Sequence, residues 1–410
     1  MKSSSIRLLL TVVLFLVPAS TGISGTATGP VKNSAMPELS SRYTSIQKAY
    51  DDASGGDPLL MQSVYFIEDV NLNRDIETTL LGGYDSSFTT ASGSTVIYGK
   101  VIISSGTVTM SNVTIGNPSS TWTCTDTDLN ALPKYVESPV GVIFDGTHTW
   151  VATENGQRIY KILASTGEVV SVYPGGPGAQ YLAYDNVNTN VWVTNPGSNN
   201  VTVINATSGS SVNYASGNNP DGIVFDGANM WVANYEPATV TKIRALDGTI
   251  LQTIPVGTKD VSYPRLLAYD NIANRVWVTV CGDDKVKKIN PDTGEIEGNY
   301  DVPGYPYAIV FDGTYMWVTQ GVLDNVVKIR PSDGAIVGTY NAGFAPNGIT
   351  FDGTYIWITD QLGMVNQLRA SDSSHVGTYK TGKRPQWVTT GGGHVWITNG
   401  SDDTVSRCTY

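Results

Sequence analysis

Two sets of side chains in the last two-thirds of this 410-residue chain have types and spacing that suit chemistry. Glu154 and Glu236 each follow an apolar Trp-Val segment, and a glutamate held in a pocket can act as a general acid or base. Oxygen donors of the kind that calcium prefers follow four such segments: Asn195, Asn234, Asp360 and Asn399. Asn and Asp are also the usual turn formers at strand ends, so we expect no cofactor, with calcium as the alternative.

The second set contains polar, aromatic and cationic side chains, most of which come just after a proline. Its members are Asp221, Tyr235, Arg265, Tyr307, Asn347, Gln386 and Trp387. Such a set in a concave place forms a binding surface. Trp387 stands outside the regular tryptophan spacing described below, so it is not explained by packing alone.

A repeat positions both sets. Seven apolar segments centred on Trp-Val or Trp-Ile recur at intervals of 39 to 46 residues: Trp150, Trp192, Trp231, Trp277, Trp317, Trp357 and Trp396. Each unit opens with a proline and an apolar strand, then a turn, the tryptophan strand, a third strand, a second turn and a fourth strand. Four antiparallel strands per unit without a helix are typical of a propeller blade, so the pattern predicts an all-β, seven-bladed β-propeller.

Several of the first turns read Asp-Gly, as at Asp145-Gly146 and Asp312-Gly313, and this pair predicts a type I′ hairpin. The prolines and the residues that follow the tryptophan strands then share the opposite rim. We call that rim the mouth, and it carries both sets of candidate residues.

The last unit lacks a fourth strand. A spare segment before the first unit, residues 131–137, is expected to complete it and to close a ring over residues 122–410. This places Cys124 just ahead of the closing strand and Cys408 at the end of the strand it would pair with, which predicts a disulfide; two separately buried thiols are the alternative. Cys281 would lie alone on a loop.

The N-terminal part divides further. A basic start, an apolar run from Leu8 to Val17 and small residues beyond predict a signal peptide over residues 1–19, followed by a flexible leader over residues 20–41. Export to the periplasm or the extracellular space is therefore expected, and no other apolar segment reaches the length of a membrane span. Short strands with Gly-Gly turns over residues 42–118 resemble the opening rungs of pectate-lyase-like parallel β-helices, which implies a small β-helix-like module.

The repeated pattern Pro-x-Gly-Ile-x-Phe-Asp-Gly-x-x-x-Trp-Val-Thr-Asn resembles YVTN/NHL-type propellers and, among them, the streptogramin B (virginiamycin B) lyase family. That resemblance implies histidines just after the first-strand prolines, with glutamates nearby, for lactone opening. No residue after a proline is a histidine here, and His148, His375 and His394 fall at turn or packing positions.

We therefore expect an exported, monomeric, non-catalytic propeller whose mouth presents its loops to a protein, peptide or glycan. A lyase-like or lactonase-like enzyme using Glu154, Glu236 or a metal is the alternative, and carbohydrate binding led by the N-terminal module is a third reading. The net charge of −11 argues against nucleic acid and anionic membrane surfaces as partners.

Overall fold

The computed structural model describes residues 31–33, 42–43, 45–62, 65–66, 70–84, 88, 91, 95–98, 101–116, 122–129 and 137–409. The chain divides into two compact units, Met1–Pro118 and Ser119–Tyr410. The predicted signal peptide lies outside the described residues. Within the described ranges, no helix has both the length and the hydrophobicity needed to cross a bilayer.

The first unit is built from parallel strands, which confirms the small β-helix-like module. Its described strands form three parallel sheets: β3 (Pro58–Gln62), β6 (Glu77–Tyr84) and β9 (Thr107–Ser111); β4 (Tyr65–Phe66), β7 (Thr95–Tyr98) and β10 (Val113–Gly116); β5 (Val70–Leu72) and β8 (Val101–Ile103). Successive strands along the chain belong to successive sheets. The chain therefore coils, with one strand per sheet in each turn.

A short helix, α1 (Ile46–Asp52), begins at Ser45, whose side chain accepts a hydrogen bond from the backbone N–H of Lys48. Its apolar residues are buried in the same core as the parallel strands. Two short antiparallel strands, β1 (Val31–Asn33) and β2 (Arg42–Tyr43), extend the first sheet beside β3. The flexible leader predicted for residues 20–41 is therefore wrong at β1, because its backbone pairs with both β3 and β2.

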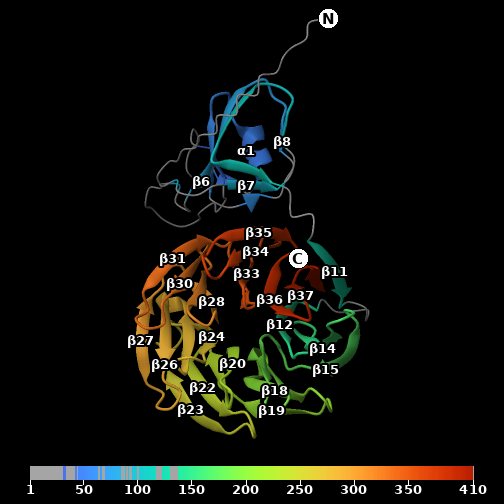
Figure 1. Ribbon diagram of the computed structural model, residues 1–410, viewed down its shortest axis with the longest axis vertical. Coiled ribbons are helices and arrows are strands. Elements are labelled where there is room, and N and C mark those ends of the chain that lie inside the picture. Colours follow the sequence, from blue (N-terminus) through green and yellow to red (C-terminus); the bar gives the residue numbers. More distant parts are fainter. Residues whose placement is uncertain are drawn as a thin grey trace, which may run out of the picture. The chain divides into compact units, whose positions relative to one another are not determined.

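The second unit contains seven four-stranded antiparallel sheets over its described residues, which confirms the seven-bladed propeller (Figure 1). Blades 1 to 3 are β12 (Pro139–Phe144), β13 (His148–Thr153), β14 (Arg158–Leu163), β15 (Val169–Pro174); β16 (Leu182–Asp185), β17 (Asn190–Asn195), β18 (Asn200–Asn205), β19 (Ser211–Ala215); and β20 (Pro220–Phe225), β21 (Asn229–Asn234), β22 (Thr239–Arg244), β23 (Ile250–Pro255).

Blades 4 and 5 are β24 (Pro264–Asp270), β25 (Arg275–Val280), β26 (Lys285–Ile289), β27 (Ile296–Asp301); and β28 (Pro306–Phe311), β29 (Met316–Gln320), β30 (Asn325–Ile329), β31 (Ile336–Asn341). Blades 6 and 7 are β32 (Ile349–Phe351), β33 (Tyr355–Thr359), β34 (Met364–Arg369), β35 (His375–Lys380); and β36 (Pro385–Gly391), β37 (His394–Asn399), β38 (Thr404–Thr409), β11 (Thr123–Asp128). Short 3₁₀ turns, η2 (Pro196–Ser198) and η3 (Cys281–Asp283), follow the second strands of blades 2 and 4.

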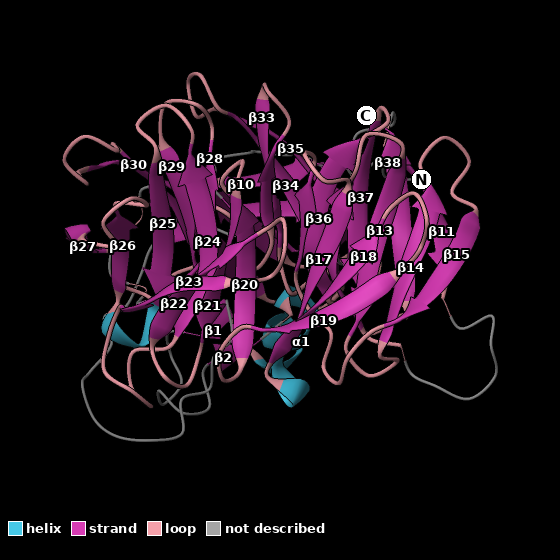
Figure 2. Ribbon diagram, turned by 90° about the horizontal axis from the view of Figure 1, so that it is seen from below, coloured by secondary structure: helices cyan, strands magenta, loops and turns pink. Residues whose placement is uncertain are grey.

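The first strands of consecutive blades contact one another, so these strands lie innermost around the central channel (Figure 1). The strands run between two rims, which Figure 2 shows from the side. All seven repeated tryptophans are fully buried. In five blades the indole packs against a tyrosine of the fourth strand, as in Trp150 and Tyr173, whose ring centroids are 5.6 Å apart. The tryptophan repeat is therefore explained by packing within the ring.

The Asp-Gly turns differ from the prediction. In the turn after Asp145, Gly146 has a positive φ of 101° and the next residue does not. A type I′ turn needs two residues with positive φ, so this turn is not type I′. Glycine at the first central position is typical of a type II′ turn. The Asp145 carboxylate accepts hydrogen bonds from the backbone N–H groups of Thr147 and His148, and from Nε1 of Trp150 at 2.7 Å. The aspartate thus ties the turn to the buried indole, and Asp226, Asp312 and Asp352 do the same.

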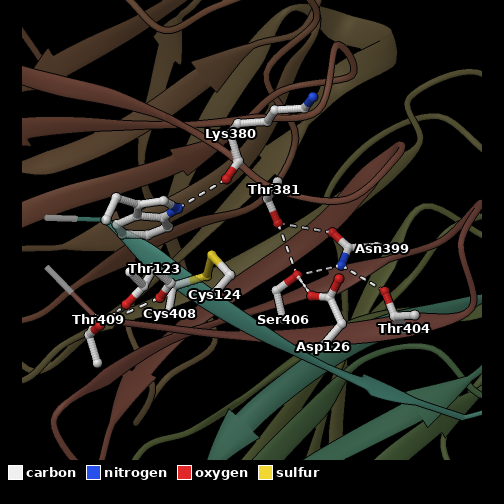
Figure 3. Close-up of a disulfide and its surroundings, with 11 residues drawn as sticks. Thr123, Cys124, Asp126, Lys380, Thr381, Asn399, Thr404, Ser406, Cys408 and Thr409 are labelled. Carbon is white, nitrogen blue, oxygen red and sulfur yellow. Dashed lines mark hydrogen bonds between the residues drawn. A yellow bond between two sulfur atoms is a disulfide. The ribbon is translucent and has the colours of Figure 1, made fainter. Parts of the chain in front are cut away.

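The strand that closes the ring is β11, not residues 131–137 as predicted. β11 pairs along its whole length with β38, and this register places Cys124 opposite Cys408. The two sulfur atoms form a disulfide across the seam (Figure 3). The prediction placed Cys124 ahead of the closing strand, whereas Cys124 lies within it. Residues 130–136 lie outside the described residues.

Neighbouring blades are also joined by cations that the sequence analysis missed. At five of the seven junctions a lysine or arginine of one third strand donates to a backbone carbonyl in the next blade: Lys161 to Ala206, Lys242 to Pro291, Lys288 to Pro331, Lys328 to Ala370 and Arg407 to Ser165. The four lysine ammonium groups also lie over a tryptophan ring of their own blade. These cations therefore stabilise the ring from blade to blade.

Replacing Lys328 with methionine should lower the free energy of unfolding by about 1–2 kcal/mol, because the Ala370 carbonyl then loses its buried donor. Urea unfolding followed by tryptophan fluorescence measures the change. The matched control is Lys383→Met, whose side chain is 84% exposed, and we expect it to change stability by less than about 0.5 kcal/mol. Equal losses in the two variants would contradict the inter-blade role of Lys328.

Candidate functional site

A backbone irregularity places the second set of predicted residues around the mouth. In five blades the pairing of the first and second strands shifts register directly after the proline, as between Pro220 and Ile223 and between Pro264 and Leu267. A β-bulge turns the side chain of the extra residue away from its regular direction. The residues at these bulges are Val140, Asp221, Arg265, Tyr307 and Gln386.

The centre of the site is an ion pair between blades 3 and 4. Arg265 Nη1 donates to Asp221 Oδ2 at 2.7 Å, and the Asp221 side chain is 3% exposed. Gly222 allows this approach, because a Cβ at its position would lie 2.5 Å from the Arg265 carbonyl oxygen. Asp221 Oδ1 and Arg265 Nε are buried without a hydrogen-bond partner. The pair is therefore held tightly but is not fully satisfied.

Tyrosine rings enclose the guanidinium. Its central carbon lies 4.5 Å from the ring centroid of Tyr235 and 5.3 Å from that of Tyr307, both within the range of cation–π attraction. Tyr235 in turn stacks on Tyr263 at 4.6 Å, and Tyr305 lies beside Tyr307 at 6.5 Å. About a quarter of the Arg265 side chain remains exposed. The mouth thus presents a cation fixed between aromatic faces.

The remaining predicted residues fill the other side of the mouth. The hydroxyl groups of Tyr181 and Tyr307 are 2.8 Å apart and hydrogen-bonded, and the edge of Tyr181 meets Trp387 at a centroid distance of 5.2 Å. Asn347 Nδ2 donates to Gln386 Oε1 at 3.1 Å. The structure therefore brings all seven members of the second set to one rim, in two adjoining groups.

Sequence reasoning missed Tyr181, Tyr263 and Tyr305. A signal was available for two of them, because Tyr263 and Tyr305 stand directly before the first-strand prolines of consecutive blades. Both have a positive φ, 49° and 62°, which a bulky residue adopts only at an energetic cost. Their place in the site depends on this backbone conformation, which the residue type alone does not predict.

Burial shifts the pKa values of several groups at the mouth. Burial raises the pKa of Asp221, although Arg265 opposes the shift. Burial also raises the pKa values of the Tyr235 and Tyr307 phenols, so both stay neutral at physiological pH. All three histidines lie at the other rim, because His148, His375 and His394 each begin a strand that starts from a turn there.

The two glutamates considered as catalytic candidates, Glu154 and Glu236, lie in different surroundings. Glu154 accepts a hydrogen bond from Gln180 Nε2 at 3.3 Å and lies close enough to Asp221 to raise its pKa. Glu236 is exposed and accepts from Asn219 Nδ2 at 3.4 Å. Glu154 is therefore part of the mouth, whereas Glu236 lies on a surface loop.

The four residues considered as metal ligands are fully buried and hold the loops of their own blades. The amide groups of Asn195, Asn234 and Asn399 each donate to two residues at the start of the next strand, as Asn234 does to Thr239 and Thr241. The Asp360 carboxylate accepts from the backbone of Leu362 and Met364. The structure does not bring the four together, and no group of three acidic, histidine or cysteine residues suited to a metal occurs in the described ranges.

A partly buried aspartate near this rim, Asp324, predicts a pH effect. Burial raises the pKa of Asp324 to about 6, while the Ala345 backbone N–H opposes the shift. The unfolded pKa is about 3.9, so the folded state binds the proton more tightly and the free energy of unfolding falls as pH rises from about 4 to 6. Asp324→Asn should therefore be more stable than wild type by roughly 2 kcal/mol at pH 7.5 and equal to it near pH 4. Urea unfolding across this range measures the difference, and a pH-independent difference would contradict the assignment.

Together, these strands form a seven-bladed β-propeller whose fold is similar to that of virginiamycin B lyase. Virginiamycin B lyase from Staphylococcus aureus is 19% identical, with a TM-score of 0.61 over 70% of this chain and 99% of that chain. The same values hold for its catalytically inactive histidine-to-alanine variant with quinupristin. Hydrazine synthase of Kuenenia stuttgartiensis is 17% identical, with a TM-score of 0.57 over 68% of this chain and 97% of that chain.

At these identities the likeness establishes the fold alone. No protein-family model and no curated protein matches the sequence.

Proposed function

We propose that this protein is an exported, non-catalytic binding propeller that holds a protein or peptide partner at its mouth. The observation that carries the proposal is the Arg265 guanidinium, fixed by buried Asp221 between the rings of Tyr235 and Tyr307. Arginine, tyrosine and tryptophan are the residues that most often dominate binding energy at protein interfaces. Because the ion pair and the stacked rings already fix these side chains, little rotamer entropy remains to be lost on binding.

Export is supported by the basic and apolar start of the chain and by a disulfide, since such bonds persist in oxidising compartments. A partner outside the cell would meet the mouth as a rim of polar loops around an aromatic and cationic centre. This is the usual arrangement of a protein interface, with a few anchors inside a wetter border.

A random peptide library displayed on phage and selected on the mature protein tests the proposal. Peptides that bind the mouth should lose at least tenfold in affinity with Tyr235→Ala, which leaves the ion pair intact. The matched control is Arg275→Ala, which removes an arginine of similar exposure, also ion-paired, from the other rim. Selected peptides that bind both variants as well as wild type would overturn the mouth as the site, and mouth-dependent binding on a glycan array would assign the partner to glycans.

A lyase-like or lactonase-like activity is the second candidate, favoured by the fold shared with virginiamycin B lyase and by Glu154 beside Asp221. Incubation with quinupristin, followed by liquid chromatography and mass spectrometry, would detect a linearised or hydrated product. Turnover that disappears in Glu154→Gln would replace the binding proposal with the enzyme. No product over a day at micromolar protein would leave the binding proposal in place.

A further inference from the structure

The central channel has a second candidate site at the rim opposite the mouth, where the first strands end. A shallow, open cavity of about 430 Å³ lies there between blades 1, 2 and 3. It is lined by Phe144, Leu182, Ala183, Tyr184, Asn186, Ile223, Val224 and Phe225. Cavities of this size hold small ligands, and mainly apolar walls with one or two polar groups are typical of such sites.

The aromatic walls of this cavity come from one repeated position. The first-strand residue that pairs with the position directly before the repeated tryptophan is aromatic in six of the seven blades: Phe144, Tyr184, Phe225, Tyr269, Phe311 and Phe351. All six are half-buried rather than fully packed. Three of these residues, from three consecutive blades, line the cavity: Phe144, Tyr184 and Phe225.

Three aspartates stand next to these rings in the chain, at the same rim. An aspartate follows each of the three rings, namely Asp145, Asp185 and Asp226. The carboxylates of Asp145 and Asp185 lie close enough to the Tyr184 hydroxyl to raise its pKa, together with burial. Asp145 and Asp185 accept hydrogen bonds from backbone N–H, amide and indole groups, which are neutral. A titratable group, His148, also lies near them, with its Nδ1 3.5 Å from Asp145 Oδ2.

We propose that this cavity binds a small organic cation, a methyl-substituted ammonium group whose methyls contact the three aromatic rings and whose charge is favoured by the buried carboxylates of Asp145 and Asp185 near Tyr184. None of the lining residues is cationic, so nothing in the wall repels such a ligand. An ammonium with apolar substituents is attracted by aromatic faces and loses less hydration than a bare ammonium when it enters an apolar cavity. The site is independent of the mouth, since its residues belong to the other rim.

The probe is choline, and its neutral isostere 3,3-dimethylbutan-1-ol separates charge from shape. Isothermal titration calorimetry on the mature protein should give at least tenfold tighter binding of choline than of the alcohol. Phe225→Leu should weaken choline binding at least fivefold. Phe351→Leu removes the equivalent ring from blade 6, away from the cavity, and should leave choline binding unchanged.

Equal affinity for choline and the alcohol would show that the positive charge does not contribute to binding, which would overturn the proposed preference for a cation. Choline binding that Phe351→Leu weakens as much as Phe225→Leu would overturn the location. No binding of either probe by wild type at millimolar concentration would overturn the proposal, and thermal melting of each variant verifies that it is folded.

Discussion

Replacing Cys408 with serine should lower the free energy of unfolding by about 2–5 kcal/mol, the largest single effect that this structure predicts. The bond joins residues 284 positions apart, so it restricts a very long loop of the unfolded chain. It also anchors β11, the one strand of the ring that comes from before the first blade. Urea unfolding of wild type with and without reductant, and of Cys408→Ser, measures the contribution.

The seam has other contacts that survive this change. Ser406 Oγ donates to Asp126, the threonine hydroxyls of Thr123 and Thr409 are bonded, and Trp122 Nε1 donates to the Lys380 carbonyl (Figure 3). The variant should therefore remain folded but be insensitive to reductant. Cys281→Ser is the control, because this buried thiol forms no disulfide and donates to the Tyr263 carbonyl through a group that serine can replace. Reduced wild type that is as stable as the oxidised protein would contradict the role of the bond.

Asp221→Ala should lower the free energy of unfolding by about 3 kcal/mol, because it leaves the Arg265 guanidinium without its partner in the mouth. We expect the lower end of the usual range for buried pairs, since a quarter of the Arg265 side chain still reaches water. The same variant should loosen the arginine from between the tyrosine rings. The affinity of the mouth for peptides should therefore fall together with the free energy of unfolding.

The double variant Asp221→Leu with Arg265→Met tests the reason for this loss. Removing both charges eliminates the desolvation cost of the pair, so the double variant should be more stable than Asp221→Ala. Guanidinium chloride is unsuitable here because it screens ion pairs, so urea should be used. A double variant that is at least as unstable as the single one would show that packing, rather than the unpaired charge, dominates.

The fold was predictable because its signals are local. Each blade is a run of consecutive antiparallel strands within about forty residues, so strand pattern, turn residues and the tryptophan repeat are read directly along the chain. The residue after each first-strand proline could be placed at the mouth for the same reason, because consecutive strands run in opposite directions between the two rims. Six residues of the second set were found in this way, and Tyr235 was found from its place after a tryptophan strand.

The ion pair, the cations between blades and the cavity at the opposite rim could not be read from the sequence. Each joins residues from different blades, and their contact depends on how closely two blades pack, as at Gly222 beside the Arg265 carbonyl. The asparagines after the tryptophan strands show the same limit. Their side chains suit both a metal and a turn, and the three-dimensional arrangement assigned them to turns.

The sequence by itself thus determined an all-β ring of seven blades, its two rims and the residues at its mouth, because these follow from short-range strand and turn preferences. The tertiary structure alone decided that β11 closes the ring, that Asp221 pairs with Arg265, and that aromatic rings of three blades border one cavity. These features depend on contacts between segments forty or more residues apart, whose geometry is fixed only when neighbouring blades pack together.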